Sequence, residues 1–371
     1  MTVDAETLRD WLEGGEPVTV LDVRPQKERA EWRIPGSLYV DAYEALRARS
    51  PGALDGVSLP RDRPVVTVCA AGRTSLLAAE VLRARGFTAY SLEGGMRSWS
   101  GAWNTADVAA GVPGMQIVQV RRTGKGCLSY IVGTDGEAAV IDPSVDPVVY
   151  TAIAGKRGWK IVSIIETHVH ADHLSRALPL RRAANARHFL PRQERVSFAY
   201  EPVNDGMVIP LGSHRDAFTA LHTPGHTAES TCYLLAGAVL FTGDTLFLRG
   251  VGRPDLGGGL RQAGKQCQAL CHSLARLKAL SGDTMVLPGH TDQPVAFDGI
   301  PLCSPLRNVI TDNPLLGLSE REFVDSILAR IPATPANFLA IMRMNETGEL
   351  AAEGSTDLEG GSNRCAVTVA Q

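Results

Sequence analysis

Histidine and aspartate side chains follow four separate hydrophobic runs of this sequence. The polar motifs read THVHADH at 167–173, PGH at 224–226, TGD at 242–244 and PGH at 288–290. Each preceding run (161–166, 217–221, 238–241 and 284–287) is short and rich in β-branched or aromatic residues, which is typical of a buried strand. Side chains after strand ends sit on loops that a rigid sheet holds in place. Imidazole and carboxylate groups gathered in this way predict a metal centre, and they suit zinc, iron or manganese.

A cysteine stands at a further strand end. The apolar run 64–68 leads directly into Cys69, and a helix is predicted at 75–85 from its apolar spacing. A thiol at such a turn faces backbone N–H groups and the positive end of a helix, which favours a thiolate or persulfide anion. The same amides would hold the outer sulfur of a persulfide or an oxygen of a thiosulfonate. The predicted persulfide loop comprises Ala70, Ala71, Gly72, Arg73, Thr74 and Ser75.

The bulk composition indicates a globular protein of two domains. The chain has 371 residues, 44% hydrophobic and 21% charged, with a formal net charge of −3 and no block of basic residues. Nucleic acid and anionic membranes are therefore not expected as partners. The start of the chain has no apolar segment typical of a signal peptide, and no run reaches the roughly 18 apolar residues of a membrane helix. We expect a cytoplasmic protein, and its seven cysteines do not suggest a disulfide framework.

The elements that must position these residues predict an α/β fold. Residues 1–105 alternate strands and helices, which indicates a parallel sheet flanked by helices. Residues 106–114 are small and polar, with glycines and a proline, and are expected to form a linker. A second domain is predicted at 115–346, and the tail 347–371 is expected to be disordered because it shows no apolar periodicity.

The first domain resembles the rhodanese (sulfurtransferase) family. The motifs that carry the resemblance are LDVR at 21–24, IPGS at 34–37, CAAGRTS at 69–75 and LEGG at 92–95, in family order. The resemblance implies that Cys69 is catalytic and exchanges sulfur with thiosulfate, sulfite or a small persulfide. Asp22 and Arg24 are expected to fix the loop by hydrogen bonding. Arg73 stands one place earlier than in the common form of the motif.

The second domain resembles the metallo-β-lactamase superfamily, because all four histidine and aspartate motifs occur in its order. This implies an αββα sandwich with the metal at one edge. Two branches are similar to the chain. In the persulfide dioxygenase branch one Fe(II) would be held by His168, His226 and Asp244, a two-His, one-carboxylate triad with open coordination positions. The groups His170, Asp172, His173 and His290 would then orient ligands or move protons.

In the glyoxalase II branch the same residues would hold two Zn(II) ions and activate a water. One ion would bind His168, His170 and His226, the other Asp172, His173 and His290, with Asp244 bridging. The stretch RGVGRPD at 249–255 favours the dioxygenase branch, because it resembles the segment that follows the iron-binding Asp there. Arg249 and Arg253 are candidate substrate-binding residues, since Leu315 stands where many members that use glutathione have Arg.

The resemblances together predict an enzyme of sulfane-sulfur metabolism. A low-molecular-weight thiol persulfide would be oxidised with dioxygen to sulfite in the second domain, while Cys69 transfers persulfide sulfur. A glyoxalase II type hydrolase with a passenger or sulfur-relay rhodanese domain is the alternative. A homodimer is expected from the family.

Overall fold

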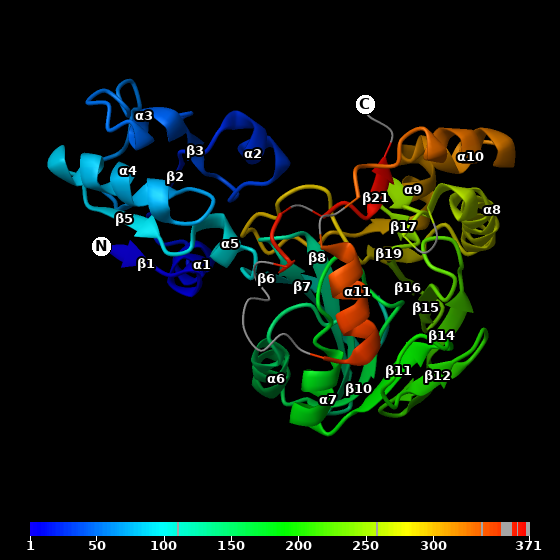
Figure 1. The fold of residues 1–371 in the computed structure, drawn as a ribbon. Coiled ribbons are helices and arrows are strands. Elements are labelled where there is room, and N and C mark those ends of the chain that lie inside the picture. The colour runs from blue at the N-terminus through cyan, green and yellow to red at the C-terminus, as the bar shows by residue number, and fades with distance from the viewer. Residues whose placement is uncertain (110, 257–258, 335–336, 350–357, 362, 369–371) are drawn as a thin grey trace.

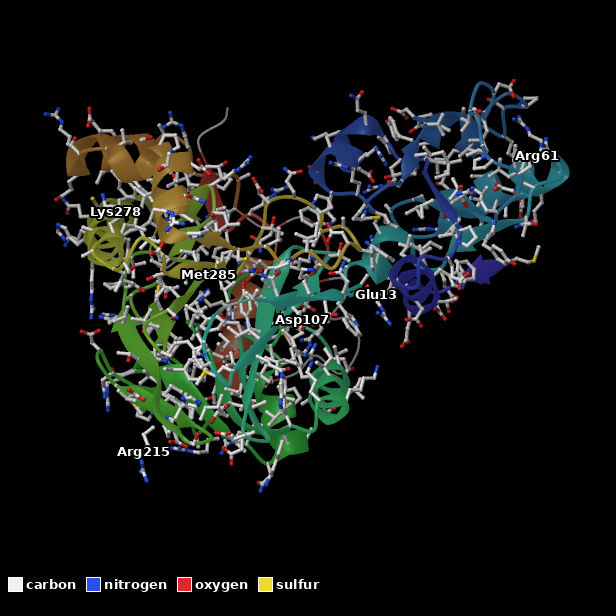
Figure 2. All side chains as sticks on the ribbon, turned by 180° about the vertical axis from the view of Figure 1, so that it is seen from behind. Glu13, Arg61, Asp107, Arg215, Lys278 and Met285 are labelled. Atoms are coloured by element: carbon white, nitrogen blue, oxygen red, sulfur yellow. The ribbon has the colours of Figure 1, made fainter. Side chains whose placement is uncertain are left out.

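The computed structural model describes residues 1–109, 111–256, 259–334, 337–349, 358–361 and 363–368. Figure 1 shows a smaller N-terminal domain, coloured blue to cyan, beside a larger domain that contains the rest of the chain. In the view from behind, Arg61 lies at the outer end of the small domain and Arg215 at the far edge of the large one (Figure 2). The two domains meet near α5 and β6.

The small domain is built on a five-stranded parallel sheet with the order β1-β5-β4-β2-β3. Its strands are β1 (Thr2–Val3), β2 (Thr19–Asp22), β3 (Leu38–Tyr39), β4 (Val65–Val68) and β5 (Ala89–Leu92). Its helices are α1 (Ala5–Glu13), α2 (Gln26–Glu31), α3 (Tyr43–Arg47), α4 (Arg73–Ala84) and α5 (Gly95–Trp99). Alternate strand residues face opposite sides, so Val65 packs with Leu82 of α4 while Val66 packs with Leu8 of α1 and Trp99 of α5. This is the predicted parallel sheet with helices on both faces.

The large domain contains two main sheets. The first has the order β12-β11-β10-β9-β8-β7-β6, and its strands are β6 (Asn104–Val108), β7 (Gln116–Arg122), β8 (Cys127–Thr134), β9 (Glu137–Ile141), β10 (Lys160–Ile165), β11 (Arg187–Pro191) and β12 (Glu201–Val203). The second has the order β13-β14-β15-β16-β19-β20, with β13 (Val208–Leu211), β14 (His214–His222), β15 (Thr231–Leu235), β16 (Val239–Gly243), β19 (Met285–Pro288) and β20 (Ser304–Pro305). A small third sheet joins β17 (Leu246–Phe247), β18 (Gly250–Gly252) and β21 (Ala366–Thr368).

The two main sheets pack face to face with helices outside. Inward side chains of both sheets, such as Tyr130 and Phe241, form one core. The opposite face of the first sheet packs against α6 (Pro147–Lys156) and α7 (Ala177–Ala184). The opposite face of the second sheet packs against α8 (Gly259–Lys278), α9 (Leu306–Asp312), η1 (Pro314–Gly317) and α10 (Glu320–Leu328). The predicted αββα sandwich is confirmed.

The start of the predicted linker is a strand instead. β6 pairs antiparallel with β7 along its whole length and forms the edge of the first sheet. Ala106 and Val108 are buried while Asp107 is exposed, a period of two that fits an edge strand. The segment looked like a linker because its outward residues are polar. The connection between the domains is therefore short, and the first strand of the sandwich follows α5 almost at once.

The described part of the tail is packed rather than disordered. β21 pairs with β18, and Glu359, Cys365 and Val367 are buried. The helix α11 (Phe338–Thr347) precedes this segment and lies over the second domain (Figure 1). Residues 350–357, 362 and 369–371 of the predicted tail lie outside the described residues. The tail acquires structure through tertiary contacts, to which sequence periodicity gives no clue.

None of the helices among the described residues combines the length and hydrophobicity needed to cross a membrane.

Candidate metal centre

The ends of strands in both sheets bring the predicted motifs together. The THVHADH motif follows β10 of the first sheet, while PGH at 224–226, Asp244 and His290 follow β14, β16 and β19 of the second. β16 and β19 are parallel neighbours, so Asp244 and His290 leave the sheet at the same edge. The helix α11 braces the first motif, because Asn345 Nδ2 donates to the carbonyls of His170 and His173, each at 2.8 Å. The site therefore sits at one edge of the sandwich.

His168, His226 and Asp244 form one buried group. His168 Nε2 lies 4.0 Å and His226 Nε2 lies 3.5 Å from Asp244 Oδ2. All three of these atoms are buried without a hydrogen-bond partner in the protein. Buried polar atoms are normally satisfied, so three of them aimed at one point require a missing partner. Two imidazole nitrogens and one carboxylate oxygen suit a divalent transition metal, and the residues therefore fit the metal implied by the sequence.

The Nδ1 atoms of His168 and His226, which face away from the shared point, each form a hydrogen bond. The Thr167 hydroxyl donates to Asp142 Oδ2 at 2.8 Å, so its oxygen accepts from His168 Nδ1 at 2.9 Å. His226 Nδ1 donates to the carbonyl of Arg253 at 2.8 Å. With the proton on Nδ1, each Nε2 keeps its lone pair for a metal.

The glycine at 252 explains part of the RGVGRPD motif. A Cβ at this position would lie 1.9 Å from the Asp244 carbonyl oxygen and 2.9 Å from His226 Cβ. Only a residue without a side chain allows β18 to pass so close to two of the three groups. The motif therefore packs against the centre through its backbone.

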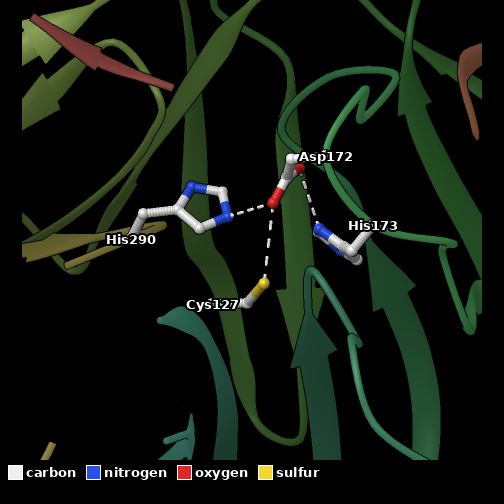
Figure 3. A group of neighbouring side chains, drawn as sticks. All are labelled: Cys127, Asp172, His173 and His290. Atoms are coloured by element: carbon white, nitrogen blue, oxygen red, sulfur yellow. Dashed lines mark hydrogen bonds and ion pairs between the residues drawn. The ribbon is translucent and has the colours of Figure 1, made fainter. Parts of the chain in front are cut away.

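A second buried group lies beside the first. Figure 3 shows Cys127, Asp172, His173 and His290 arranged around the Asp172 carboxylate. His290 Nε2 lies 2.9 Å and Cys127 Sγ 3.6 Å from Asp172 Oδ2, while His173 Nδ1 lies 3.0 Å from Oδ1. His290 also connects the two groups, because its Nδ1 lies 2.5 Å from Asp244 Oδ1. His170 instead faces Asp142, with Nε2 at 3.2 Å from Oδ1.

The histidine pKa values differ between the two buried groups, because the rings have different charged neighbours. Burial, together with the neighbouring His170, holds the pKa of His168 well below its usual value, so this ring is neutral and able to bind a metal. Burial alone would lower the pKa of His290, but the carboxylates of Asp244 and Asp172 hold it well above its usual value. Burial would likewise lower the pKa of His173, which Asp172 raises to about 10. Without a metal, the second group is thus a charge-paired cluster of acids and imidazoles.

A cavity of about 300 Å³ opens on the His290 side of the centre. Most of its wall area is apolar, with Phe247, Leu248 and Leu302, and its polar members include Arg249, His290, Asp292, Gln293 and Asn363. Arg249 is exposed and lines this cavity, as a substrate-binding residue would.

Arg253 does not line the cavity, contrary to its candidate role. Its side chain is fully buried and forms a two-point ion pair with Asp255, with both bonds at 2.8 Å. The same guanidinium donates to the carbonyls of Pro332 and Arg364. Because these bonds occupy its donors, Arg253 is a structural residue that ties three segments together.

The strand-to-helix turn after β4 places Cys69 at the base of a tight backbone loop. Gly72 has a φ of +81° and caps α4. Met96 N donates to the Cys69 carbonyl at 2.9 Å, and Ser75 Oγ lies 3.3 Å from Cys69 Sγ. A Cβ on Gly95 would lie 2.2 Å from the Cys69 carbonyl oxygen, so glycine is required there. Arg73, a member of the predicted persulfide loop, is exposed at the start of α4.

Asp22 and Arg24, expected to fix this loop by hydrogen bonding, bond instead to each other and to the segment that follows β2. Arg24 donates to both carboxylate oxygens of Asp22, at 3.0 and 2.8 Å, and also to the carbonyl of Trp32. Both side chains are buried.

Sequence reasoning missed several residues of the centre. Asp142 directly follows β9, which pairs with β10, so the strand-end argument would have found it, and its φ of +48° is unusual for a residue other than glycine. Cys127 gave no such signal because it begins β8. It reaches the site through a single bridge to His290, which is distant in sequence.

Comparisons with known proteins agree with this architecture. The model of the metallo-beta-lactamase superfamily matches residues 122–290, and that of the rhodanese-like domain matches residues 4–102. The chain joins a rhodanese-like domain to a metallo-β-lactamase domain. Their boundaries enclose Cys69 in the first domain and all four histidine and aspartate motifs in the second.

Proteins similar to the metallo-β-lactamase domain belong to different named groups. A hydroxyacylglutathione hydrolase from Maricaulis maris is 35% identical over 159 residues, which cover 42% of this chain and 57% of that protein. The chain thus spans little more than half the length of this relative. ETHE1 from Myxococcus xanthus is 28% identical with a TM-score of 0.53, over 62% of this chain and 97% of that one. A metallo-beta-lactamase from Staphylococcus aureus is 26% identical with a TM-score of 0.57, over 64% of this chain and 74% of that one.

Proposed function

We propose that the metallo-β-lactamase domain is an iron-dependent persulfide dioxygenase and that Cys69 of the rhodanese-like domain transfers sulfane sulfur. The observation that carries the proposal is the group of three unpartnered buried atoms, His168 Nε2, His226 Nε2 and Asp244 Oδ2. They form the two-His, one-carboxylate set that leaves positions open for substrate and dioxygen. The similarity to ETHE1, which extends over 97% of that chain, supports the persulfide dioxygenase branch over the glyoxalase II branch.

The overall reaction would convert a thiol persulfide, dioxygen and water into the thiol and sulfite. The outer sulfur is oxidised while dioxygen is reduced, and water supplies the third oxygen of sulfite. A bound ferrous ion would supply the activation of dioxygen. The chain's own residues would hold and orient the substrate. The apolar wall at Phe247 and Leu248 would exclude water, and Arg249 would bind a carboxylate of the carrier thiol.

His290 and Asp172 would transfer protons in the proposed reaction. His290 faces the cavity and contacts the carboxylates of both Asp244 and Asp172. A proton could therefore pass between the cavity and Asp172 without leaving the buried network.

The proposal is tested by oxygen uptake with glutathione persulfide as substrate. The protein is loaded anaerobically with ferrous iron, and sulfite formation is measured in parallel. We expect uptake that requires iron and is lost in His226→Ala. The control is His272→Ala, which changes an exposed histidine on α8 that bonds to Glu320 and lies outside the metal motifs. An iron-loaded protein without uptake on any thiol persulfide would overturn the proposal.

A two-zinc hydrolase of the glyoxalase II type is the second candidate. It is favoured by the second buried group, which includes Asp172, His173 and His290, and by the hydroxyacylglutathione hydrolase relatives. Metal analysis of the purified protein distinguishes the two. About one iron per chain supports the dioxygenase, whereas about two zincs with hydrolysis of a glutathione thioester support the hydrolase.

A further inference from the structure

A cavity of about 520 Å³ lies between the two domains, beside the Cys69 loop. The rhodanese-like domain contributes Ala70, which follows Cys69 directly, together with Trp32 and Met96. The other domain contributes Gly124, from the turn between β7 and β8, and Gly360 and Gly361, from the segment before β21. The Cys69 side chain itself is buried, and Ala70 is the member of its loop that lines this space, whose far wall belongs to the metallo-β-lactamase domain.

This far wall is fixed by bonds across the domain boundary. Trp32 Nε1 donates to the Thr123 carbonyl at 3.0 Å, and Arg122 Nε donates to the Ser100 carbonyl at 2.8 Å. Lys125 Nζ donates to the Glu359 carbonyl at 2.9 Å, so the turn at Gly124 and the segment at Gly360 are held to each other. All of the donor side chains are buried.

Gly124 shows how closely the domains approach. A Cβ at this position would lie 1.9 Å from the Trp99 carbonyl oxygen and 2.8 Å from the Ser100 carbonyl carbon. These atoms belong to the backbone at the end of α5 and cannot move aside as a flexible side chain could. Any larger residue at 124 must push the far wall away from the Cys69 loop.

We propose that this cavity binds the sulfur donors and acceptors of Cys69 and limits them to small molecules, up to a thiol of short-peptide size. The proposal rests on the sulfur-carrying role of Cys69 given under the proposed function. Its volume falls within the range of about 300–1,000 Å³ typical of small-molecule sites. Because the wall at Gly124 and Gly360 stands opposite Ala70, we infer that a cysteine on the surface of a folded protein approaches the loop less easily than a small thiol.

The charges of the lining favour a zwitterionic thiol. Arg97 and Glu28 both line the cavity, as does Glu31, which lies 3.7 Å from Arg364 of the other domain. A wall with both signs of charge matches the ammonium and carboxylate groups of an amino-acid or short-peptide thiol better than a purely apolar carrier.

The transfer needs no further reactant. With thiosulfate, the Cys69 thiolate attacks the outer sulfur, the sulfur–sulfur bond of thiosulfate breaks, and sulfite leaves. A small thiolate then attacks the outer sulfur of the Cys69 persulfide, a new sulfur–sulfur bond forms, and the Cys69 thiolate is released. Each step exchanges one sulfur–sulfur bond for another.

The test compares a small and a large acceptor on the full-length protein. Cys69 is loaded with thiosulfate, and the persulfide is verified by intact mass. Its decay is then followed with glutathione or with reduced thioredoxin. A free small persulfide serves as a donor to show that this thioredoxin can accept sulfur. We expect glutathione to react faster by at least about 100-fold at equal thiolate concentration.

Gly124→Ala should reduce this selectivity to below about tenfold by raising the rate with thioredoxin, because the wall is displaced. The control is Gly155→Ala in α6, where a Cβ meets no atom within 4 Å. Equal rates with both acceptors in the unmodified protein would overturn the inference and leave the sulfur-carrying role intact. Failure of Cys69 to form a persulfide with thiosulfate or a small persulfide would overturn both. The ratio of the two rates in the unmodified protein tests the inference even if Gly124→Ala does not fold.

Discussion

Thr167 shows how one hydroxyl can set the state of a buried histidine. Its single proton goes to Asp142, which leaves its oxygen to accept the Nδ1 proton of His168. Asp142 is held in turn, since Oδ1 accepts from the Thr167 backbone N–H at 2.8 Å. Residues that orient metal ligands in this way typically affect metal affinity by about 10–100-fold.

We expect Thr167→Val to weaken metal binding by about tenfold or more, because the proton on His168 Nδ1 loses its acceptor. Anaerobic titration of the metal-free protein with ferrous or cobaltous ion measures the affinity. Thr311→Val is the matched control, since this exposed hydroxyl donates to the Arg307 carbonyl of its own helix. Unchanged affinity in a folded Thr167→Val protein would show that the hydroxyl does not orient His168.

At the scale of elements, the segment around Glu359 holds several parts of the second domain together. The Glu359 carboxylate accepts from Arg122 Nη1 and from Arg176 Nη2, each at 2.9 Å, and from the Leu174 backbone N–H at 2.8 Å. Leu174 follows the metal motif directly, and Arg122 ends β7. Burial alone would raise the pKa of Glu359, but Arg122 and Arg176 lower it to about 2.

This shift makes a prediction about pH. Glu359 stabilises the fold fully above its usual pKa of 4.5, and this contribution is lost as the pH falls towards about 2. We expect Glu359→Gln to lower the free energy of unfolding by roughly 3 kcal/mol near neutral pH, and by progressively less as the pH falls below 4.5. Denaturant unfolding at several pH values measures this.

The control for this experiment is Glu201→Gln, which removes a surface ion pair with Arg187. Exposed pairs contribute about 1 kcal/mol or less, so a small effect is expected there. A difference between Glu359→Gln and the unmodified protein that does not shrink towards acid would refute the assigned pKa.

Strands that carry both a clear pattern and a chemical residue could be predicted from the sequence. β10, β14, β16 and β19 were recognisable from their apolar runs, and the polar residues that follow them meet in space. Contacts between distant segments could not be predicted. The Cys127–His290 bridge depends on how β8 lies against the loop after β19. The described part of the tail is likewise held by distant partners. β21 pairs with β18, and Glu359 forms an ion pair with Arg122, and local composition reveals neither contact.

At the scale of the whole molecule, one loop links the metal centre to the other domain. It begins at His290 and carries Phe297, which packs against the rhodanese-like core with its ring 6.2 Å from that of Trp99. The same loop offers the Val295 carbonyl to Thr123 and the Ala296 carbonyl to Asn104. These two bonds anchor the loop within its own domain, while the packing of Phe297 and the hydrogen bonds of Trp32 and Arg122 join the domains in addition to the short connection at β6.

We expect Phe297→Ala to separate the unfolding of the two domains, because it removes apolar contact across their boundary. Differential scanning calorimetry should show one transition in the unmodified protein and two in the variant. Ile300→Ala is the matched control, since that side chain in the same loop is 63% exposed. A single unchanged transition in Phe297→Ala would mean that the other contacts couple the domains by themselves.

The wall at Gly360 has a consequence for biosynthesis. The ribosome completes the rhodanese-like domain long before it adds the residues that close the space beside Cys69. Under the proposal, a nascent chain with a folded rhodanese-like domain would expose the Cys69 loop to large as well as small thiols. Its acceptor selectivity would be complete only after the segment at Gly360 has been added and packed.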